Sequence, residues 1–325
     1  MKFAFFTHWE LSKPGIKVKK DEERTYRPDG MLPLILNADV YNFTIPLRTE
    51  VIEKYDWIII NNDKAFYKNK ALVEQIFSLK KPKIAVLQEG PIFDWQTWKM
   101  EQQWIYRKLL KKAELFICNN KEHIKYYKEY CKNVCTYRAP INLEKFINHR
   151  LKEKEDAIMI NGNNTPWYNA NSSMDIAKSI RGFLVCMQSM GQSQTDEVQY
   201  LPLLLPDNNF MKIPFVAWNQ WMDILSDFKY AINMMTAVAS GTFSVNCAAV
   251  GTLCIGNKQF DTQSYLFPNL SIDAWDIKKG KELLKRLVED KEFRDEQIKI
   301  MRERVKEYDV DMIKKEMLEN FKKVI

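Results

Sequence analysis

The sequence predicts an α/β protein made of two doubly wound domains, each a parallel sheet covered by helices. Apolar runs of strand length alternate with amphipathic runs of helix length, and the connections between them are short. The alternation stops in a charged segment at residues 138–156 and then begins again. The chain has 325 residues, which suits two such domains of about 150 residues each.

The first half of the chain supplies one sheet. Apolar or alternating runs predict strands at residues 2–7, 55–62, 82–90 and 114–120, and helical periodicity predicts helices at 69–81, 94–113 and 121–131. Residues 27–40 predict a turn followed by either a helix or a further strand.

The second half supplies the other sheet. Strands are expected at 157–162, 199–206, 210–217, 229–235 and 252–257, and helices at 171–188, 218–228 and 244–250. A long amphipathic helical region follows at 276–308, and a last helix at 311–325. We therefore expect domains at 1–145 and 146–305, followed by a C-terminal helix at 306–325.

Composition narrows the class of protein. No apolar run approaches the ~20 residues of a membrane span, and the N-terminus lacks the small-residue cleavage site of a signal peptide. Six scattered cysteines predict buried, reduced thiols and hence a cytoplasmic protein, in a host cytoplasm if the source is viral. Because no His or second Cys pair completes the set begun by Cys131 and Cys135, the sequence predicts no metal site. The oligomeric state is left open.

The net charge of +7 has two interpretations. A basic surface suits a polyanionic partner such as nucleic acid, whereas lysine-rich helix faces in solvent would give the same charge.

Nearly every predicted strand ends in polar residues. The carboxyl ends of parallel strands are where doubly wound domains bind ligands, so we expect a cleft there between the two domains. The polar strand ends are Thr7-His8-Trp9, Asn61-Asn62-Asp63, Gln88-Glu89-Gly90, Asn119-Asn120, residues 161–165, residues 236–242 and Asn257-Lys258.

The stretch AVASGTFSVNCAAVGTLCIGNK, residues 237–258, holds three of the ten glycines. A glycine-containing turn that leads into a helix presents unpaired N–H groups and the positive end of the helix dipole, which suits a phosphate. The alternative is an ordinary helix cap by Ser240 or Thr242.

Residues 225–258 resemble the second-domain core of GT-B glycosyltransferases, especially the large retaining family 4. That family's helix and strand, E-A-M-A-x-G-x-P-V-I, correspond to residues 246–255, and its interdomain P-N-G-V-D-x-x-x-F corresponds to residues 140–146. The resemblance implies two Rossmann-like domains with a cleft between them and C-terminal helices that cross back onto the first domain. It also implies a nucleotide-diphosphate sugar as co-substrate, UDP-sugar above all, with no other cofactor.

The resemblance assigns the donor site to the second domain. The residues expected there are Gly241, Thr242, Phe243 and Ser244 as the phosphate cradle, with Asn246, Asn163, Asn164, Thr165, Lys258 and Asp261 around it.

Two departures from the family pattern stand out. Family members carry two glutamates eight positions apart, whereas this chain has Asn246 at the second position and Val238 near the first. The family's Arg and Lys after the first strand of this domain are replaced by NGNNTPWYNANSS, without a cation before Lys178.

The expected catalytic groups lie in the first domain. The strand IAVLQEGPIFDW is similar to a strand of phage DNA glucosyltransferases, and it places Glu89 at its end with Asp94 beyond. A carboxylate there can orient or deprotonate an acceptor hydroxyl; alternatively, Glu89 only caps a helix. His8 is the histidine that directly follows a strand, whereas His123 and His149 are expected on the surface.

The sequence thus favours a glycosyltransferase that acts on an acceptor hydroxyl, in one version a hydroxymethylated base of phage-type DNA. The alternatives are a glycan- or protein-directed transferase, a nucleotide-sugar-binding protein without turnover, and a sugar-nucleotide epimerase.

Overall fold

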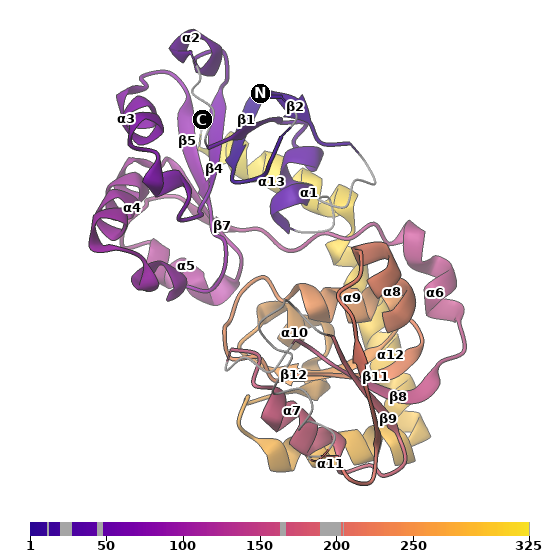
Figure 1. Cartoon of the computed structure of the whole chain (residues 1–325). Coiled ribbons are helices and arrows are strands. Elements are labelled where there is room, and N and C mark those ends of the chain that lie inside the picture. Colours follow the sequence, from indigo (N-terminus) through magenta and orange to yellow (C-terminus); the bar gives the residue numbers. More distant parts are fainter. Residues whose placement is uncertain are drawn as a thin grey trace. The chain divides into compact units, whose positions relative to one another are not determined.

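The computed structural model describes residues 1–11, 13–19, 28–43, 48–162, 167–188, 203 and 205–324. The chain divides into two compact units, which Figure 1 shows in colours that follow the sequence. The first unit is Met1–Pro140 with Val310–Ile325, and the second unit is Ile141–Asp309. The last helix therefore belongs to the first unit.

The first unit is built on a seven-stranded sheet of order β2-β3-β1-β4-β5-β6-β7, in which β2 alone is antiparallel to its neighbour. Its strands are β1 Phe3–Thr7, β2 Ile16–Lys17, β3 Asp39–Asn42, β4 Trp57–Asn61, β5 Lys83–Leu87, β6 Leu115–Cys118 and β7 Val134–Thr136. Its helices are α1 Pro28–Ile35, α2 Thr49–Ile52, α3 Lys70–Ser78, α4 Met100–Lys112, α5 Ile124–Tyr127 and α13 Val310–Lys323.

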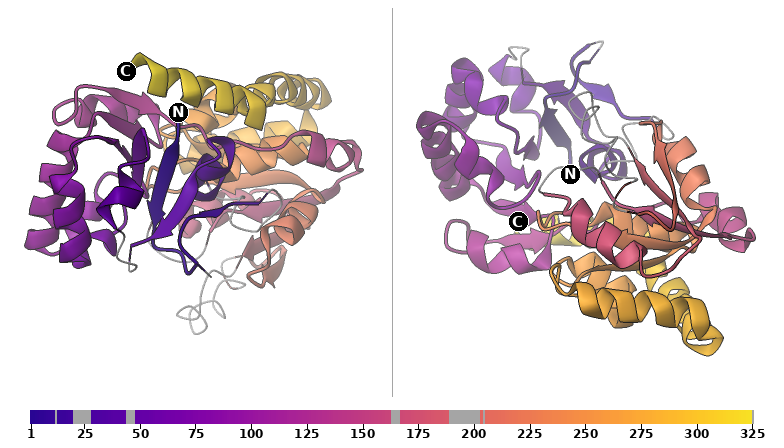
Figure 2. Two further views of the ribbon diagram at one scale, coloured as in Figure 1. Left: turned by 90° about the horizontal axis from the view of Figure 1, so that it is seen from above. Right: turned by 60° about the horizontal axis from the view of Figure 1, so that its bottom comes forward.

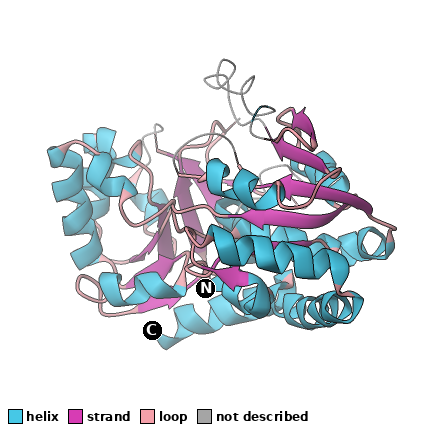
Figure 3. Ribbon diagram, turned by 90° about the horizontal axis from the view of Figure 1, so that it is seen from below, coloured by secondary structure: helices cyan, strands magenta, loops and turns pink. Residues whose placement is uncertain are grey.

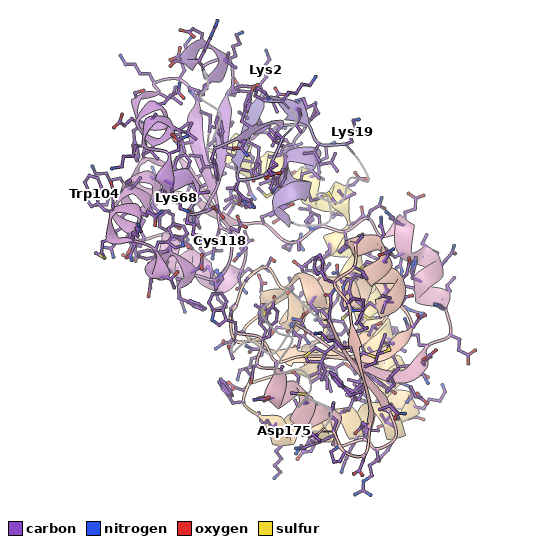
Figure 4. All side chains as sticks on the ribbon, in the orientation of Figure 1. Lys2, Lys19, Lys68, Trp104, Cys118 and Asp175 are labelled. Carbon is purple, nitrogen blue, oxygen red and sulfur yellow. The ribbon has the colours of Figure 1, made fainter. Side chains whose placement is uncertain are left out.

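Alternation along the strands gives this sheet two apolar faces. One face, which includes Phe6 and Ile60, packs against α3 and α4. The other face, which includes Phe5 and Ile59, packs against α1 and against the buried side of α13. Figure 2 shows α13, in yellow, beside the strands of this unit. On the solvent side of α4, the exposed side chain of Trp104 projects outward (Figure 4).

Local signals explain three differences from the expected elements of this unit. The turn followed by either a helix or a strand that was expected at 27–40 is replaced, from residue 28 on, by both a helix and a strand. Helix α1 is followed by β3, because Asn37 takes a left-handed conformation (φ 51°) and the helix cannot continue through it. The expected helix at 94–113 is a 3-10 turn, Asp94–Thr97, followed by α4, since Trp98 and Lys99 are extended. The expected helix at 121–131 contains only the short α5, after a 3-10 turn at Lys121–His123.

The second unit is built on a six-stranded parallel sheet of order β10-β9-β8-β11-β12-β13. Figure 3 distinguishes its strands from the helices that cover them. The strands are β8 Glu155–Ile160, β9 Leu184–Gln188, β10 Asn209–Ile213, β11 Phe228–Asn233, β12 Leu253–Asn257 and β13 Ser271–Ile272. The helices are α6 Ile147–Leu151, α7 Ala170–Ala177, α8 Trp218–Leu225, α9 Thr242–Val250, α10 Asp261–Leu266, α11 Ile277–Glu289 and α12 Lys291–Arg304.

The expected helix at 171–188 is wrong in its second half. Helix α7 ends at Ala177, Gly182 takes a left-handed conformation (φ 78°), and the apolar run after it is β9. The long helical region at 276–308 is divided at Asp290, whose side chain accepts from Phe293 N and so starts α12. Most of the strand expected at 199–206 lies outside the described residues.

All six cysteines are free thiols, and five of them are buried. Within the described ranges, no helix combines the length and the apolar character that crossing a membrane requires.

Candidate functional site

The strand order of each sheet reverses at one place, which is where ligands bind in doubly wound sheets. In the first unit, the chain adds strands on one side of β1 and then continues from β4 on its other side. In the second unit, the same reversal occurs between β8 and β11. A crevice opens beyond the carboxyl ends of the strands at such a reversal. The candidate site residues should therefore follow β1, β4, β8 and β11.

His8, Asp63 and Glu89 meet at the reversal of the first unit. They follow β1, β4 and β5, which are neighbours in the sheet. Nδ1 of His8 lies 3.8 Å from Oδ2 of Asp63, and Oε2 of Glu89 accepts a 2.7 Å hydrogen bond from Nδ2 of Asn61. One ligand atom of each of the three side chains lies within 4.8 Å of the others. We name this group the His8 cluster.

Sequence reasoning selected His8 and Glu89 but not Asp63. Asp63 was recognisable as part of a polar strand end, but its approach to His8 depends on β4 being the neighbour of β1. Oδ1 of Asp63 accepts from Ala65 N at 2.6 Å, which fixes the carboxylate in the turn after β4.

Asp94 stands in the 3-10 turn after β5, outside the His8 cluster. Its carboxylate lies beside Gly90. Burial raises the pKa of Asp94, while a hydrogen bond from Trp98 and the charge of Lys64 oppose the rise.

His123 is buried, which corrects the expectation that it lies on the surface. Its Nδ1–H donates to Oε1 of Gln88 at 3.0 Å, and burial lowers the pKa of His123 to about 4. Gln88 and Asn119 both donate side-chain N–H groups to the carbonyl oxygen of Gly90, at 3.0 and 2.8 Å. These three side chains therefore hold the turn that carries Glu89. His149 pairs instead with Asp223, at 2.7 Å.

Gly241 forms the start of helix α9 in the second unit. It is the N-cap residue, with φ 62°, and a Cβ there would lie 1.8 Å from Oγ1 of Thr262. Glycine is therefore required, and the cap has no side chain. Ser240 and Thr242, the alternative caps, pair with each other through their hydroxyl groups at 2.9 Å. The first N–H groups of α9, at Thr242 and Phe243, have no partner inside the helix.

The side chains of Phe243 and Ser244 face other parts of the protein. The ring of Phe243 lies 6.3 Å from that of Trp221. The hydroxyl of Ser244 is buried and donates to Oε1 of Gln263 at 2.7 Å, and Gln263 in turn donates to Cys254 O at 2.8 Å. Any contact that these two residues make with a phosphate must therefore use the backbone.

The remaining residues assigned to the donor site lie on three elements. Asn246 is buried in α9, Lys258 is exposed after β12, and Asp261 begins α10, where its Oδ1 accepts from Thr262 N at 2.8 Å. Asn163, Asn164 and Thr165 lie outside the described residues.

Sequence reasoning did not select Asn233, which marks the reversal in the second unit. Its Oδ1 accepts from Nδ2 of Asn161 at 2.8 Å, so the ends of β11 and β8 are joined by side chains. The sequence did contain a signal for Asn233: it is a polar residue in the otherwise largely apolar run KYAINMM. In the structure it is the last residue of β11, and it is buried.

No family model matches the sequence, and no curated protein matches it. Solved structures, by contrast, are similar to this chain. The Anabaena protein Alr3699/HepE in complex with UDP is similar with a TM-score of 0.72 at 12% identity, over 99% of this chain and 100% of that one. An alpha-glucosyltransferase in complex with UDP and a 13-mer DNA containing an HMU base has a TM-score of 0.64 at 12% identity, over 98% and 99%.

Sucrose-phosphate synthase from Thermosynechococcus elongatus has a TM-score of 0.66 at 13% identity, over 83% of this chain and 74% of that one. The chain therefore has the GT-B fold of these glycosyltransferases, and the predicted fold class is confirmed.

Proposed function

We propose that the protein is a glycosyltransferase that moves a sugar from a UDP-sugar to an acceptor hydroxyl group. The observation that carries this proposal is the buried helix α9, which begins at a side-chain-free cap, Gly241, and is the next helix after β11, a strand at the reversal. Such a helix start binds a diphosphate through backbone N–H groups and the helix dipole. Two similar structures, of HepE and of the alpha-glucosyltransferase, contain UDP, and another of HepE contains UDP-glucose.

In this proposal, the second unit binds the donor. The amides of Thr242 and Phe243 hold the diphosphate, Lys258 adds a positive charge, and Asn246 hydrogen-bonds a hydroxyl group of the ribose or the sugar. The uncharged Asn246 is the feature that favours the second candidate, a nucleotide-sugar-binding protein without turnover.

The first unit acts on the acceptor. Glu89, with His8 beside it, orients the acceptor hydroxyl and takes up its proton as the oxygen bonds to the anomeric carbon. The bond between that carbon and the diphosphate breaks, and UDP leaves. The resemblance to the retaining family favours retention of the anomeric configuration, which the NMR coupling of the product's anomeric proton tests.

For the acceptor, we propose a hydroxymethylated base in DNA. The alpha-glucosyltransferase solved with such DNA is matched over nearly its full length, and the net charge of +7 suits a polyanion. This would be DNA modification of the kind that bacteriophages use. A flipped-out hydroxymethyl group presents the hydroxyl that the reaction requires.

The donor is tested first, by thermal unfolding with UDP-, GDP-, ADP- and dTDP-sugars. A ligand at 100 times its Kd stabilises the folded protein by ~2.7 kcal/mol, so the correct donor raises the Tm. If none of them raises the Tm, the proposal is wrong.

The acceptor is tested by UDP release with duplex DNA that contains hydroxymethyluracil or hydroxymethylcytosine, against unmodified duplex and glycan acceptors. Release with a glycan alone would establish the glycan-directed alternative, and binding without any release would establish the non-catalytic one.

A further inference from the structure

The His8 cluster combines one imidazole with two carboxylates, a set that the proposed transfer reaction does not fully use. Its ligand atoms lie within 4.8 Å of one another, and the closest named pair, Nδ1 of His8 and Oδ2 of Asp63, is 3.8 Å apart. Ligands that bind one cation at ~2.1 Å are themselves roughly 3–4 Å apart. A small rotation of these side chains is enough to close the set around an ion.

Two members of the cluster are already held in place. Ala65 N donates to Oδ1 of Asp63, which leaves Oδ2 turned toward His8. Asn61 Nδ2 donates to Oε2 of Glu89 at 2.7 Å. Hydrogen bonds of this kind orient carboxylates that bind metals.

The surroundings of the cluster contain acceptors that lack donors. Asn61 is fully buried, and its Oδ1 has no hydrogen-bond partner within the described part of the chain. Because Oδ1 shares a carbon atom with Nδ2, it lies next to the amide nitrogen that binds Glu89. The register that pairs Phe6 with Ile60 places Thr7 beside Asn61, and the buried Oγ1 of Thr7 also has no partner among the described residues.

An unsatisfied buried polar atom costs about 1–3 kcal/mol, and one such oxygen here belongs to the amide group that binds Glu89. A bound cation would attract this oxygen together with the two carboxylates. We propose that His8, Asp63 and Glu89 bind a divalent transition-metal cation, with the amide oxygen of Asn61 in or next to its coordination shell. The imidazole favours Mn²⁺, Fe²⁺, Co²⁺ or Zn²⁺ over Ca²⁺ and Mg²⁺, which prefer oxygen ligands alone.

The proposed cation site shares His8 and Glu89 with the proposed acceptor site. It is therefore tested without nucleotide sugar, so that the result does not depend on transfer. Full-length protein freed of metal by a chelator is titrated with MnCl2, and free Mn²⁺ is measured by electron paramagnetic resonance. The wild type should bind one Mn²⁺ per chain. Asp63→Asn and His8→Gln should each weaken binding at least tenfold, and the nitrogen coupling of bound Mn²⁺ should disappear in His8→Gln.

His149→Gln is the matched control, because His149 also pairs with an aspartate, Asp223, but lies in the second unit. It should bind Mn²⁺ as the wild type does. Asp63→Asn retains an oxygen that can accept from Ala65 N, and circular dichroism checks that each variant is folded. Absence of saturable binding in the wild type, or an affinity in Asp63→Asn and His8→Gln equal to that of the wild type, would overturn the proposal.

Discussion

At the scale of single residues, polar side chains hold Glu89 and the turn that carries it. Its carboxylate accepts from Asn61, and the following residue, Gly90, is held by Gln88 and Asn119. Gln88 is in turn bound by the buried His123. Such hydrogen bonds hold a carboxylate in one position, which is useful for a group that is proposed to take up a proton.

The variant Glu89→Gln should lower turnover by ~10²-fold or more, because glutamine keeps the shape and the hydrogen bonding but not the basicity. The Kd of the donor should stay nearly unchanged, since the groups that are proposed to bind the donor lie in the second unit. Steady-state rates and calorimetry measure the two quantities. Near-normal turnover would show that Glu89 is structural, and the same pair of measurements on His8 and Asp94 would then identify the base.

His123 should make the stability of the protein depend on pH. Its folded pKa of about 4 lies below the ordinary 6.5, so the unfolded chain takes up the proton first as the pH falls. The stabilisation is therefore present above pH 6.5 and is lost as the pH falls toward 4, by up to ~3 kcal/mol. Urea unfolding at a series of pH values measures it. In His123→Gln, which does not titrate, this part of the pH dependence should be absent; an unchanged profile would assign it to other groups.

At the scale of elements, α9 is a helix buried on nearly every side. Val245, Cys247, Ala248, Ala249 and Val250 are all buried, and Gly251 ends the helix with φ 82°. Small side chains let the neighbouring elements approach closely, so the helix start is held in place by packing, with Gly241 against Thr262. A rigid helix start suits a phosphate site, because the N–H groups need no rearrangement on binding.

The buried Asn246 provides the test of this helix. Asn246→Ala should weaken donor binding by about 1–3 kcal/mol, because a polar group of the bound donor would be left without a partner. Ser244→Ala is the control on the same helix, since its hydroxyl binds Gln263 in the interior. It should lower stability without changing the Kd of the donor. An effect of Asn246→Ala on acceptor affinity alone would show that α9 does not bind the donor.

At the scale of the whole molecule, the chain leaves the first unit after Pro140 and returns to it at Val310. The returning helix α13 completes a core: the ring of Phe321 lies 4.9 Å from each of the rings of Phe3 and Trp57. The first unit is thus assembled from both ends of the sequence.

Two methionines of α13 measure what this helix contributes. Met317 is fully buried, whereas Met312 is 53% exposed. Met317→Ala should destabilise the first unit by about 2–5 kcal/mol, and Met312→Ala by no more than about 0.5 kcal/mol. Because the two units need not unfold together, hydrogen exchange should be followed separately in each. Equal protection in both variants would show that α13 does not support the first unit.

The sequence alone was sufficient for the fold class. Hydrophobic periodicity, together with glycines at the turns, located most strands. The resemblance at residues 225–258 predicted the GT-B fold, which the solved structures confirm. These signals are local, because a strand or a turn is encoded by neighbouring residues. Where a local signal was overlooked, as at Gly182, a strand was taken for the end of a helix. The roles of the site residues remain predictions.

Only the tertiary structure decided which side chains meet. Asp63 approaches His8, and His123 approaches Gln88, across intervals of sequence that contain whole strands and helices. These contacts depend on the order of the strands in the sheet. That order is set by the packing of both faces of the sheet and, in the first unit, also by α13, a helix from the far end of the chain. Periodicity states which residues are buried, but it contains no information about which buried residues are neighbours.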